Sequence, residues 1–196
     1  MRDEIEQTLA RVDSLCRLER IPMLGPQKAR FLFDVLRQAR PALVVECGTA
    51  IGYSGLWTAA ALELNGHGRI ITLEIDPARA RLAGEHFAAA GVAERIEQRV
   101  GDACELVKTI AGPVDFLLLD NGFSQYLPCF QGLESALADE ATVVADNVGI
   151  GAEQMKDYLD LVRGRYASET HWFETDLPWV PRDAIEVSRF RRDANG

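Results

Sequence analysis

The chain has 196 residues, enough for one domain with a sizeable core, and its 47% apolar and 26% charged content is ordinary for a globular protein. Its formal charge of -9 disfavours a nucleic-acid partner, because phosphate binding requires clusters of Lys and Arg. The charged N-terminus lacks the apolar core of a signal peptide, and no apolar run reaches the ~20 residues that span a bilayer. We therefore expect a cytoplasmic protein with no membrane partner.

The sequence contains four cysteines, at Cys16, Cys47, Cys104 and Cys129, and no two of them form a CxxC pair. Their spacing matches neither a zinc site nor a disulfide framework. Since free cysteine behaves as a small buried hydrophobe, we expect reduced thiols within the core.

Two helices are expected at the N-terminus. The first is indicated by apolar residues at helical spacing, at Ile5, Leu9, Val12 and Cys16. Such a stripe packs on a core or on a partner subunit, so a homodimer through this helix is one interpretation. A proline-containing break at residues 21–26 precedes the second helix, which is predicted over 27–39, before Pro41.

Apolar runs then alternate with helical segments as far as Asn147. The predicted strands are 43–47, 70–75, 96–100, 116–119 and 142–145. The predicted helices between them are 53–64, 77–90, 104–110 and 124–138. Short, strongly apolar strands in repeated strand–helix units predict an α/β protein with a parallel sheet and helices on both of its faces.

The pattern changes after Asn147. A helix over 152–163 is followed by two β-rich stretches, 167–174 and 184–190. Because the connection between them, 175–181, is short, these two strands are expected to pair in antiparallel fashion.

A glycine-rich loop follows the first strand, with the sequence Gly48-Thr49-Ala50-Ile51-Gly52-Tyr53-Ser54-Gly55. Its GxxxGxxG spacing differs from the dinucleotide GxGxxG, and the loop alone is also compatible with a tight strand-to-helix turn. Glu74 closes the second strand, where a carboxylate can accept hydrogen bonds from both ribose hydroxyls. Asp102, after the third strand, is placed for an adenine edge. The loop carries Glu46 and no Lys, so an adenosine ligand that has cationic groups in place of phosphates fits best.

Five stretches in chain order carry a resemblance to a known family: VVECGTAIGYSGLWTA, TLEIDPARA, VGDACE, DFLLLDNGFSQY and VVADNV. They resemble the class I S-adenosylmethionine-dependent methyltransferases, and within them the cation-dependent group that includes the catechol and caffeoyl-CoA O-methyltransferases. The resemblance runs from about Met23 to Asn147 and more loosely to Phe190. It implies a Rossmann-like, seven-stranded, mostly parallel sheet with an antiparallel last strand, formed by one domain (1–196) whose N-terminal helices (1–40) cover the cofactor and substrate site.

The resemblance also implies a set of residues that bind S-adenosylmethionine. These are Leu24, Glu46, Gly48, Thr49, Ala50, Ser54, Glu74, Asp102, Ala103 and Asp120. Glu46 would hold the amino end of the methionine moiety and Ser54 would lie near its carboxylate. Leu24 belongs to the segment that covers the cofactor in the family.

A divalent cation, Mg²⁺ or another, is implied by three oxygen-bearing residues. Asp120 follows the fourth strand, and Asp146 and Asn147 follow the fifth. Carboxyl ends of neighbouring parallel strands converge, and carboxylate and amide oxygens suit a hard octahedral ion. The alternative is that Asp146 and Asn147 cap the next helix or make an Asx turn. With a cation, two vicinal oxygens of the acceptor would chelate the metal, which would acidify the attacking hydroxyl.

The sequence departs from the family at Phe123. Members such as catechol O-methyltransferase carry a lysine general base three residues after the first metal aspartate, and a phenyl ring accepts no proton. Either the metal acidifies the hydroxyl enough for water to take the proton, or another side chain substitutes, or the substrate differs and the metal is absent. Candidate substitutes are His171, Asp176 and Tyr126. Phe123, Trp172 and Trp179 are either apolar walls for an aromatic substrate or core residues.

The sequence therefore predicts an O-methyltransferase for a small catechol-like or vicinal-oxygen acceptor. One alternative is a tRNA wobble-uridine methyltransferase, which the charge of -9 disfavours. The other is a cofactor-binding protein that has lost or altered its catalysis at Phe123.

Overall fold

The computed structural model describes residues 1–192; the last four positions of the expected 1–196 domain lie outside the described residues. A seven-stranded sheet with strand order β3-β2-β1-β4-β5-β7-β6 forms its centre. The strands are β1 (Leu43–Cys47), β2 (Arg69–Glu74), β3 (Ile96–Val100), β4 (Val114–Leu119), β5 (Leu137–Ala145), β6 (Ala167–Leu177) and β7 (Val180–Arg189).

The direction of the strands follows from their connections. Strands β1 to β5 are linked through helices and pair in parallel. Strand β7 is joined to β6 by a tight turn, and it pairs antiparallel with both β6 and β5. The predicted α/β fold, with a mostly parallel sheet and an antiparallel last strand, is confirmed.

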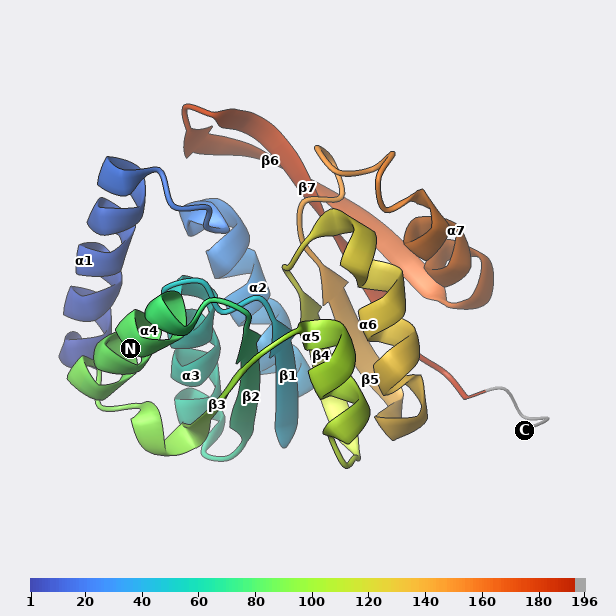
Figure 1. The fold of residues 1–196 in the computed structure, drawn as a ribbon, viewed down its shortest axis with the longest axis horizontal. Coiled ribbons are helices and arrows are strands. Elements are labelled where there is room, and N and C mark those ends of the chain that lie inside the picture. Colours follow the sequence, from blue (N-terminus) through green and yellow to red (C-terminus); the bar gives the residue numbers. More distant parts are fainter. Residues whose placement is uncertain (193–196) are drawn as a thin grey trace.

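Helices cover both faces of this sheet (Figure 1). They are α1 (Asp3–Glu19), α2 (Gly25–Ala39), α3 (Tyr53–Asn65), α4 (Pro77–Ala89), α5 (Ala103–Leu106), α6 (Tyr126–Leu133) and α7 (Lys156–Arg165). Helices α1 to α4 pack on one face, and α5 to α7 pack on the other.

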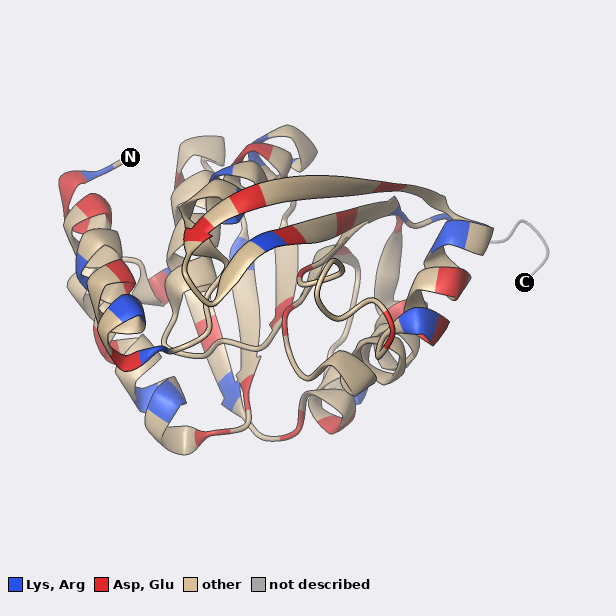
Figure 2. Ribbon diagram, turned by 90° about the horizontal axis from the view of Figure 1, so that it is seen from above, with Lys and Arg blue, Asp and Glu red and all other residues tan. Residues whose placement is uncertain are grey.

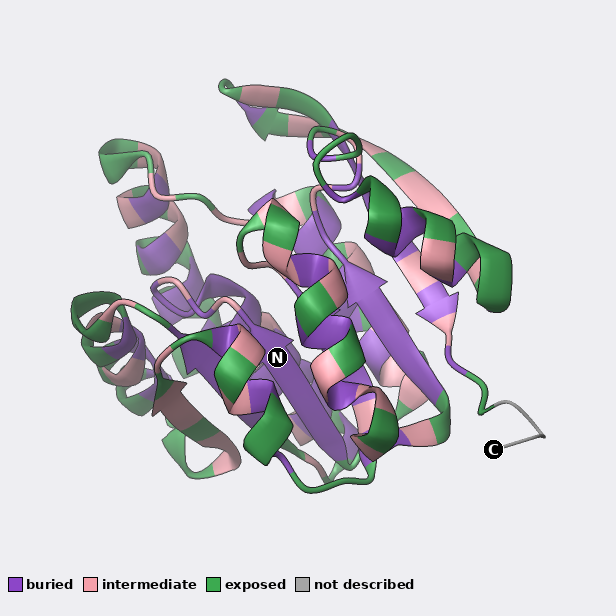
Figure 3. Cartoon of the chain, turned by 45° about the vertical axis from the view of Figure 1, so that its right-hand side comes forward, coloured by how far each residue is buried: buried purple, intermediate pink, exposed green. Residues whose placement is uncertain are grey.

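The middle strands are buried on both faces, which explains why their sequences are continuous apolar runs. Successive residues of a strand point to opposite sides. Val44 accordingly joins the core under α1 to α4, whereas Val45 joins the core under α5 to α7. Figure 3 shows these strands as buried, while exposed residues lie on the outer sides of the helices.

Three predicted boundaries are wrong. The helix expected over 124–138 ends earlier, because Leu137 pairs with Val114 and opens strand β5. Helix α7 begins at Lys156 rather than at 152. The connection expected over 175–181 is shorter, because Leu177 pairs with Val180 and the two strands continue almost to the tip of the hairpin. In each case tertiary pairing or packing overrides a local signal.

The apolar stripe of the first helix is buried within its own chain. Ile5, Val12 and Cys16 are fully buried, and α1 packs against α3 and α4. These stripe positions thus pack on the chain's own core, and a homodimer through this helix stays a prediction. In the described part of the chain, no helix combines the length and apolar composition needed to cross a bilayer.

Candidate functional site

A cavity of about 560 Å³ lies at the carboxyl ends of β1, β2 and β4. Open α/β sheets bind their ligands at this edge. The roof is formed by the segment between α1 and α2, which includes Pro22 and Met23, and by the tip of the β6–β7 hairpin, which includes Trp179. Figure 1 shows this hairpin extending past the rest of the sheet toward the N-terminal helices.

The glycine loop forms one wall of the cavity. Gly48 has a φ of 101°, and a Cβ atom there would overlap the carbonyl oxygen of Asp120. Only glycine allows this backbone approach without strain. Gly48, Thr49 and Ala50 therefore line the cavity directly beside Asp120.

Glu74 stands at the end of β2 and faces the cavity. Its Oε2 accepts a hydrogen bond from the Ala50 amide at 2.7 Å, and its Oε1 accepts one from the Asp76 amide at 3.0 Å. The helix cap is Asp76, whose Oδ1 accepts from the Ala78 amide at 2.7 Å. The remaining lone pairs of the Glu74 carboxylate are thus left for a ligand.

Glu46 lies beneath the cavity rather than on its surface, and it is 1% exposed. The hydroxyls of Ser54 and Thr72 each donate to its carboxylate at 2.5 Å. Burial raises the pKa of Glu46, although these two hydrogen bonds oppose the rise. Ser54 lines the cavity above it and connects Glu46 to the ligand space.

The predicted adenine end is formed mainly by backbone and small side chains. Gly101 and Ala103 line the cavity, whereas the Asp102 carboxylate caps α5 by accepting from the Cys104 amide at 2.9 Å. At the other side of the cavity, Leu24 also lines the wall.

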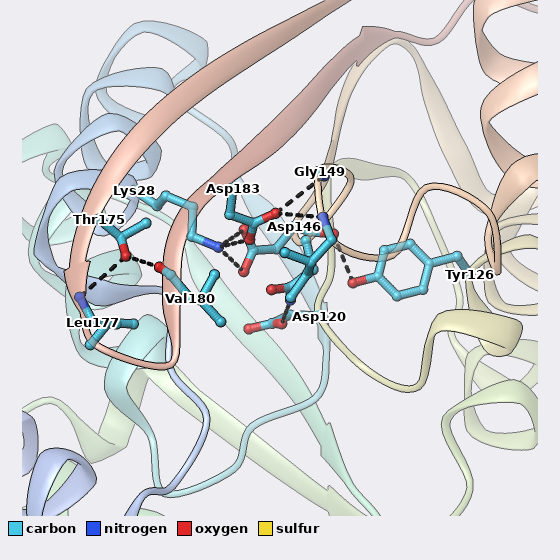
Figure 4. Close-up of polar contacts among 11 residues, drawn as sticks. Lys28, Asp120, Tyr126, Asp146, Gly149, Thr175, Leu177, Val180 and Asp183 are labelled. Carbon is cyan, nitrogen blue, oxygen red and sulfur yellow. Dashed lines mark hydrogen bonds and ion pairs between the residues drawn. The ribbon is translucent and has the colours of Figure 1, made fainter.

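A buried charge cluster lies beside the predicted metal ligands (Figure 4). The Lys28 Nζ donates to both carboxylate oxygens of Asp146, at 2.7 and 2.9 Å, and to Asp183 at 2.6 Å. Lys28 is 2% exposed, Asp146 1% and Asp183 0%. Asp183 also accepts from the amides of Gly149 and Ile150. Helix α2 is thereby joined to the ends of β5 and β7.

Three acidic side chains in this region share one cationic partner. Asp120, Asp146 and Asp183 interact electrostatically with one another and with a single ammonium, that of Lys28. Burial, and then the neighbouring Asp146, raise the pKa of Asp120 well above its ordinary value, although Lys28 opposes this. Burial lowers the pKa of Lys28, but the two aspartates outweigh it and leave the pKa raised, so Lys28 is an ammonium at neutral pH. Burial likewise raises the pKa of Asp146, and Lys28 opposes this rise too.

Of the three expected metal ligands, Asp120 and Asn147 line the cavity, whereas Asp146 does not, and Lys28 holds both of its carboxylate oxygens. Carboxylate and amide oxygens are of the kind that Mg²⁺ prefers. The Asn147 amide nitrogen donates to Asp120 Oδ1 at 3.1 Å, so turning the amide over brings its oxygen to the same place. Within residues 1–192 there is no group of three or more His, Cys, Asp and Glu side chains suited to hold a metal, and the expected set includes only two carboxylates.

The alternative role of Asp146 and Asn147 as a helix cap is not seen. Helix α7 begins only at Lys156, and its N-cap residue is Met155. Asp146 instead bonds Lys28, and Tyr126 donates to the Asp146 carbonyl at 3.0 Å. Asn147 has a left-handed φ of 58°, which turns the chain sharply after β5.

The acceptor end of the cavity is apolar. Phe123, Leu177, Trp179 and Val180 line it together with Ile150. The second predicted aromatic wall, Trp172, does not line the cavity; it is 54% exposed, and the Arg182 guanidinium lies 4.7 Å from the centre of its ring.

None of the three candidate substitutes for the missing lysine lines the cavity. The Tyr126 hydroxyl is buried and engaged by Asp146. Asp176 pairs with Arg17 at 2.8 Å on the surface, and the His171 ring packs against Phe31 with 4.6 Å between ring centres.

Sequence reasoning missed Lys28 and Asp183. A signal was present, since Lys28 is four residues after Leu24 and four before Leu32, on a helix face that is otherwise apolar. A lysine on a buried face implies a carboxylate partner. Its partner Asp183 gives a similar signal, because it is a charged residue within the last strand, next to Ala184.

The comparisons with known proteins agree with this geometry. A family model described as "Methyltransferase domain" matches residues 45–148. A catechol O-methyltransferase from Niastella koreensis is 34% identical, covering 64% of this chain and 58% of the relative. One from Mycobacterium tuberculosis is 32% identical, covering 72% and 65%. A "Probable O-methyltransferase" from Mycobacterium tuberculosis is 31% identical, covering 82% and 73%. The first two matches thus span less than two thirds of those relatives' length.

Among solved structures, an O-methyltransferase from Bacillus cereus in complex with SAH superposes with a TM-score of 0.83 at 20% identity, covering 94% of this chain and 91% of that one. The sheet order, the antiparallel seventh strand and the cavity at the strand ends define a class I methyltransferase fold. The chain belongs to the methyltransferase domain family, and its relatives in that family are O-methyltransferases.

Proposed function

We propose that the chain transfers the methyl group of S-adenosylmethionine to an oxygen of a small acceptor with two neighbouring oxygens, such as a catechol, with the help of a divalent cation. The observation that carries this proposal is one continuous cavity in which Glu74 stands at one end and Asp120, Asn147 and an apolar wall stand at the other. The relatives named catechol O-methyltransferase support the acceptor class.

The cofactor would lie along the glycine loop. Glu74 would accept hydrogen bonds from the ribose hydroxyls, and Asp102 with Ala103 would face the adenine. Ser54 would lie near the carboxylate of the methionine moiety, and Glu46, beneath the cavity, would hold the amino end only if the cofactor displaces part of its hydrogen bonding to Ser54 and Thr72. The loop at Gly48 passes so close to Asp120 that the methyl donor and the acceptor oxygen would meet there.

Asp120, Asp146 and Asn147 would hold the cation. When bound, it would chelate two vicinal oxygens of the acceptor and lower the pKa of the attacking hydroxyl. Lys28 and Asp183 would keep Asp146 in position, because each is buried and hydrogen-bonded in the same cluster.

The chain's own contribution to the transfer is position and a preorganised field. Phe123, Leu177 and Trp179 would hold an aromatic ring and exclude water from the reacting atoms. The bond from the acceptor oxygen to the methyl carbon forms as the carbon–sulfur bond breaks, and no covalent enzyme intermediate is needed. Because Phe123 accepts no proton, the hydroxyl proton would pass to water, and the rate should rise with pH.

The test is methyl transfer from labelled S-adenosylmethionine to a panel of catechols, each with Mg²⁺ and with EDTA. The matched variants are Asp120→Ala in the cluster and Asp139→Ala on the surface. A mono-methylated catechol that requires Mg²⁺ and Asp120, but not Asp139, is the expected result.

Other outcomes contradict separate parts of the proposal. A rate unchanged by EDTA and by Asp120→Ala would refute the cation while leaving O-methyl transfer intact. Calorimetric binding of S-adenosylhomocysteine without turnover of any acceptor would favour a protein that has lost its catalysis. Greater transfer to bulk tRNA than to catechols would refute the small acceptor. We do not expect this outcome, because basic and acidic residues alternate along α1 rather than forming a basic face for nucleic acid (Figure 2).

A further inference from the structure

Three of the four cysteines meet behind the cavity although they are distant in sequence. Cys104 lies on α5 and Cys129 on α6, and their sulfur atoms are 3.5 Å apart. Cys47, the last residue of β1, also interacts with Cys129. Cys16, on α1, belongs to the core on the opposite face of the sheet.

The cluster is arranged so that Cys129 is the most nucleophilic thiol. The Asn121 side-chain amide donates to its sulfur at 3.3 Å, and the Cys47 and Cys104 thiols lie beside it. The hydrogen bond with Cys47, assisted by those from Cys104 and Asn121, outweighs burial and lowers the pKa of Cys129 to about 7. Burial, followed by the contact with Cys129, raises the pKa of Cys104 to about 12. The thiolate is the form that attacks oxidants.

The cluster is closest to solvent at Cys104. Cys47 and Cys129 are fully buried, whereas Cys104 is partly exposed. A peroxide would therefore have to approach the cluster from the side of Cys104.

The cluster is mechanically connected to the cavity. Asn121, which donates to Cys129, follows Asp120 directly and lines the cavity, as does Ala103, the neighbour of Cys104. The Asn121 Oδ1 is buried and has no hydrogen-bond partner within the described residues, so a ligand donor is the natural complement to it. A disulfide requires the two sulfurs, now 3.5 Å apart, to approach to about 2 Å. We expect this approach to disturb the hydrogen bond from Asn121 to the Cys129 sulfur.

We propose that Cys104 and Cys129 form a hydroperoxide-sensitive thiol pair, whose disulfide distorts the neighbouring end of the cavity and weakens the binding of S-adenosylhomocysteine. The Cys129 thiolate attacks the distal oxygen of the hydroperoxide, the oxygen–oxygen bond breaks, and the alkoxide or hydroxide leaves with a proton. The Cys104 sulfur then attacks the resulting sulfenic acid, which releases the oxygen as water with the thiol proton. Two thiols and one hydroperoxide thus give one disulfide, one alcohol or water, and one water.

The experiment treats the reduced protein with hydrogen peroxide and maps the peptides by mass spectrometry without reduction. A Cys104–Cys129 linkage should form while Cys16, whose pKa burial raises to about 11, stays unmodified. The affinity for S-adenosylhomocysteine, measured by calorimetry, should fall at least about tenfold on oxidation and return on reduction. The Cys104→Ser variant should bind the ligand with an affinity that peroxide no longer changes, and Cys47→Ala should still form the linkage.

Each part of the inference has its own refutation. Absence of the Cys104–Cys129 peptide after full consumption of peroxide, or a Cys47–Cys129 linkage in its place, would overturn the pair. A linkage that leaves the affinity unchanged would overturn the coupling to the cavity. The loss of affinity rests on the proposed cofactor site, but the linkage does not. Reduced protein that fails to bind the ligand would therefore refute that site and not the thiol pair.

Discussion

Replacing Lys28 by Met removes the ammonium that lies between Asp146 and Asp183 while keeping an unbranched side chain of similar length. In the native protein this ammonium donates to both carboxylates at 2.6 to 2.9 Å, and all three side chains are at most 2% exposed. Lys28→Met therefore leaves two buried carboxylates without their cationic partner.

Breaking a buried ion pair by removing one partner costs about 3–5 kcal/mol, because the remaining charge stays out of water without compensation. Two carboxylates are affected here, but Asp183 keeps the hydrogen bonds from the Gly149 and Ile150 amides. We therefore expect a loss of about 3–5 kcal/mol in the free energy of unfolding at pH 7. Adding Asp183→Asn to Lys28→Met removes one of the uncompensated charges and should restore part of the loss.

The free energy of unfolding that Lys28→Met loses should become smaller as the pH falls. The native pKa of Lys28 is raised, so its stabilising contribution is complete at every pH below the unfolded value of about 10.4. Burial already raises the pKa of Asp146, and in the variant this pKa should rise further, because the ammonium that opposes the rise is gone. A folded state that binds more protons than the unfolded state gains stability as the pH falls. The deficit of the variant should thus shrink from pH 7.5 to pH 5.

The assay is urea denaturation in EDTA at both pH values, with Lys156→Met as the matched control. Lys156 pairs with Asp160 on the surface of α7, and its side chain is 68% exposed, so its removal should change the stability by less than about 1 kcal/mol. A Lys28→Met protein within 1 kcal/mol of the wild type at pH 7.5, or a deficit that grows on acidification, would refute the buried-cluster argument.

Three further predictions concern separate parts of the molecule. Glu74→Gln should weaken the binding of S-adenosylhomocysteine by roughly 10–100-fold in calorimetry, since charged hydrogen bonds contribute about 1.5–3 kcal/mol. The control Glu85→Gln, at an exposed position, should leave this affinity unchanged. Phe123→Lys should raise the rate on catechols and shift the pH–rate profile to lower pH; an unchanged profile would mean that the missing base does not matter. Burial alone would raise the pKa of Glu186, but the hydrogen bonds from Arg163 and two hydroxyls lower it. Glu186→Gln should therefore cost stability at pH 7, and this cost should fade as the pH drops below about 4.3.

The fold was predictable because its signals are local. Apolar runs such as that before Asp120, and the glycine and proline residues between the elements, mark most strands and helices correctly. The errors are located where tertiary contacts decide. Leu137 looks helical in its local sequence, but its pairing with Val114 draws it into β5, and the pairing of Leu177 with Val180 lengthens the last hairpin.

The candidate site was predictable only in part, for a related reason. Glu74 and Asp120 could be named because Glu74 ends strand β2 and Asp120 directly follows β4, both at the same edge of the sheet. The partners of Asp146 could not, since Lys28 and Asp183 come from segments 118 residues before it and 37 residues after it. The thiol pair was hidden in the same way, because no spacing of cysteines indicates that α5 and α6 bring two of them together.

The strengths of these contacts imply where the cavity opens. Lys28 and its buried partners hold α2 to the ends of β5 and β7 at the base of the cavity. At the rim of the roof, an ion pair between Arg17 and Asp176 joins the end of α1 to the tip of the β6–β7 hairpin, and these side chains are 32% and 46% exposed. Exposed pairs contribute about 0–1 kcal/mol, several times less than a buried cluster. Separation of the hairpin tip from the end of α1 is therefore the cheaper motion, and ligands should enter there.

Arg17→Ala tests this route. If the ion pair helps to keep the roof closed, its loss should accelerate the dissociation of S-adenosylhomocysteine by about 2–5-fold, the change that up to 1 kcal/mol allows, with little effect on the free energy of unfolding. Stopped-flow displacement measures the rate, and Arg30→Ala, which breaks the exposed pair with Asp34 on α2, is the matched control. Equal rates in the Arg17→Ala protein and the wild type would show that this pair does not limit opening, and the entrance would then have to lie elsewhere along the rim.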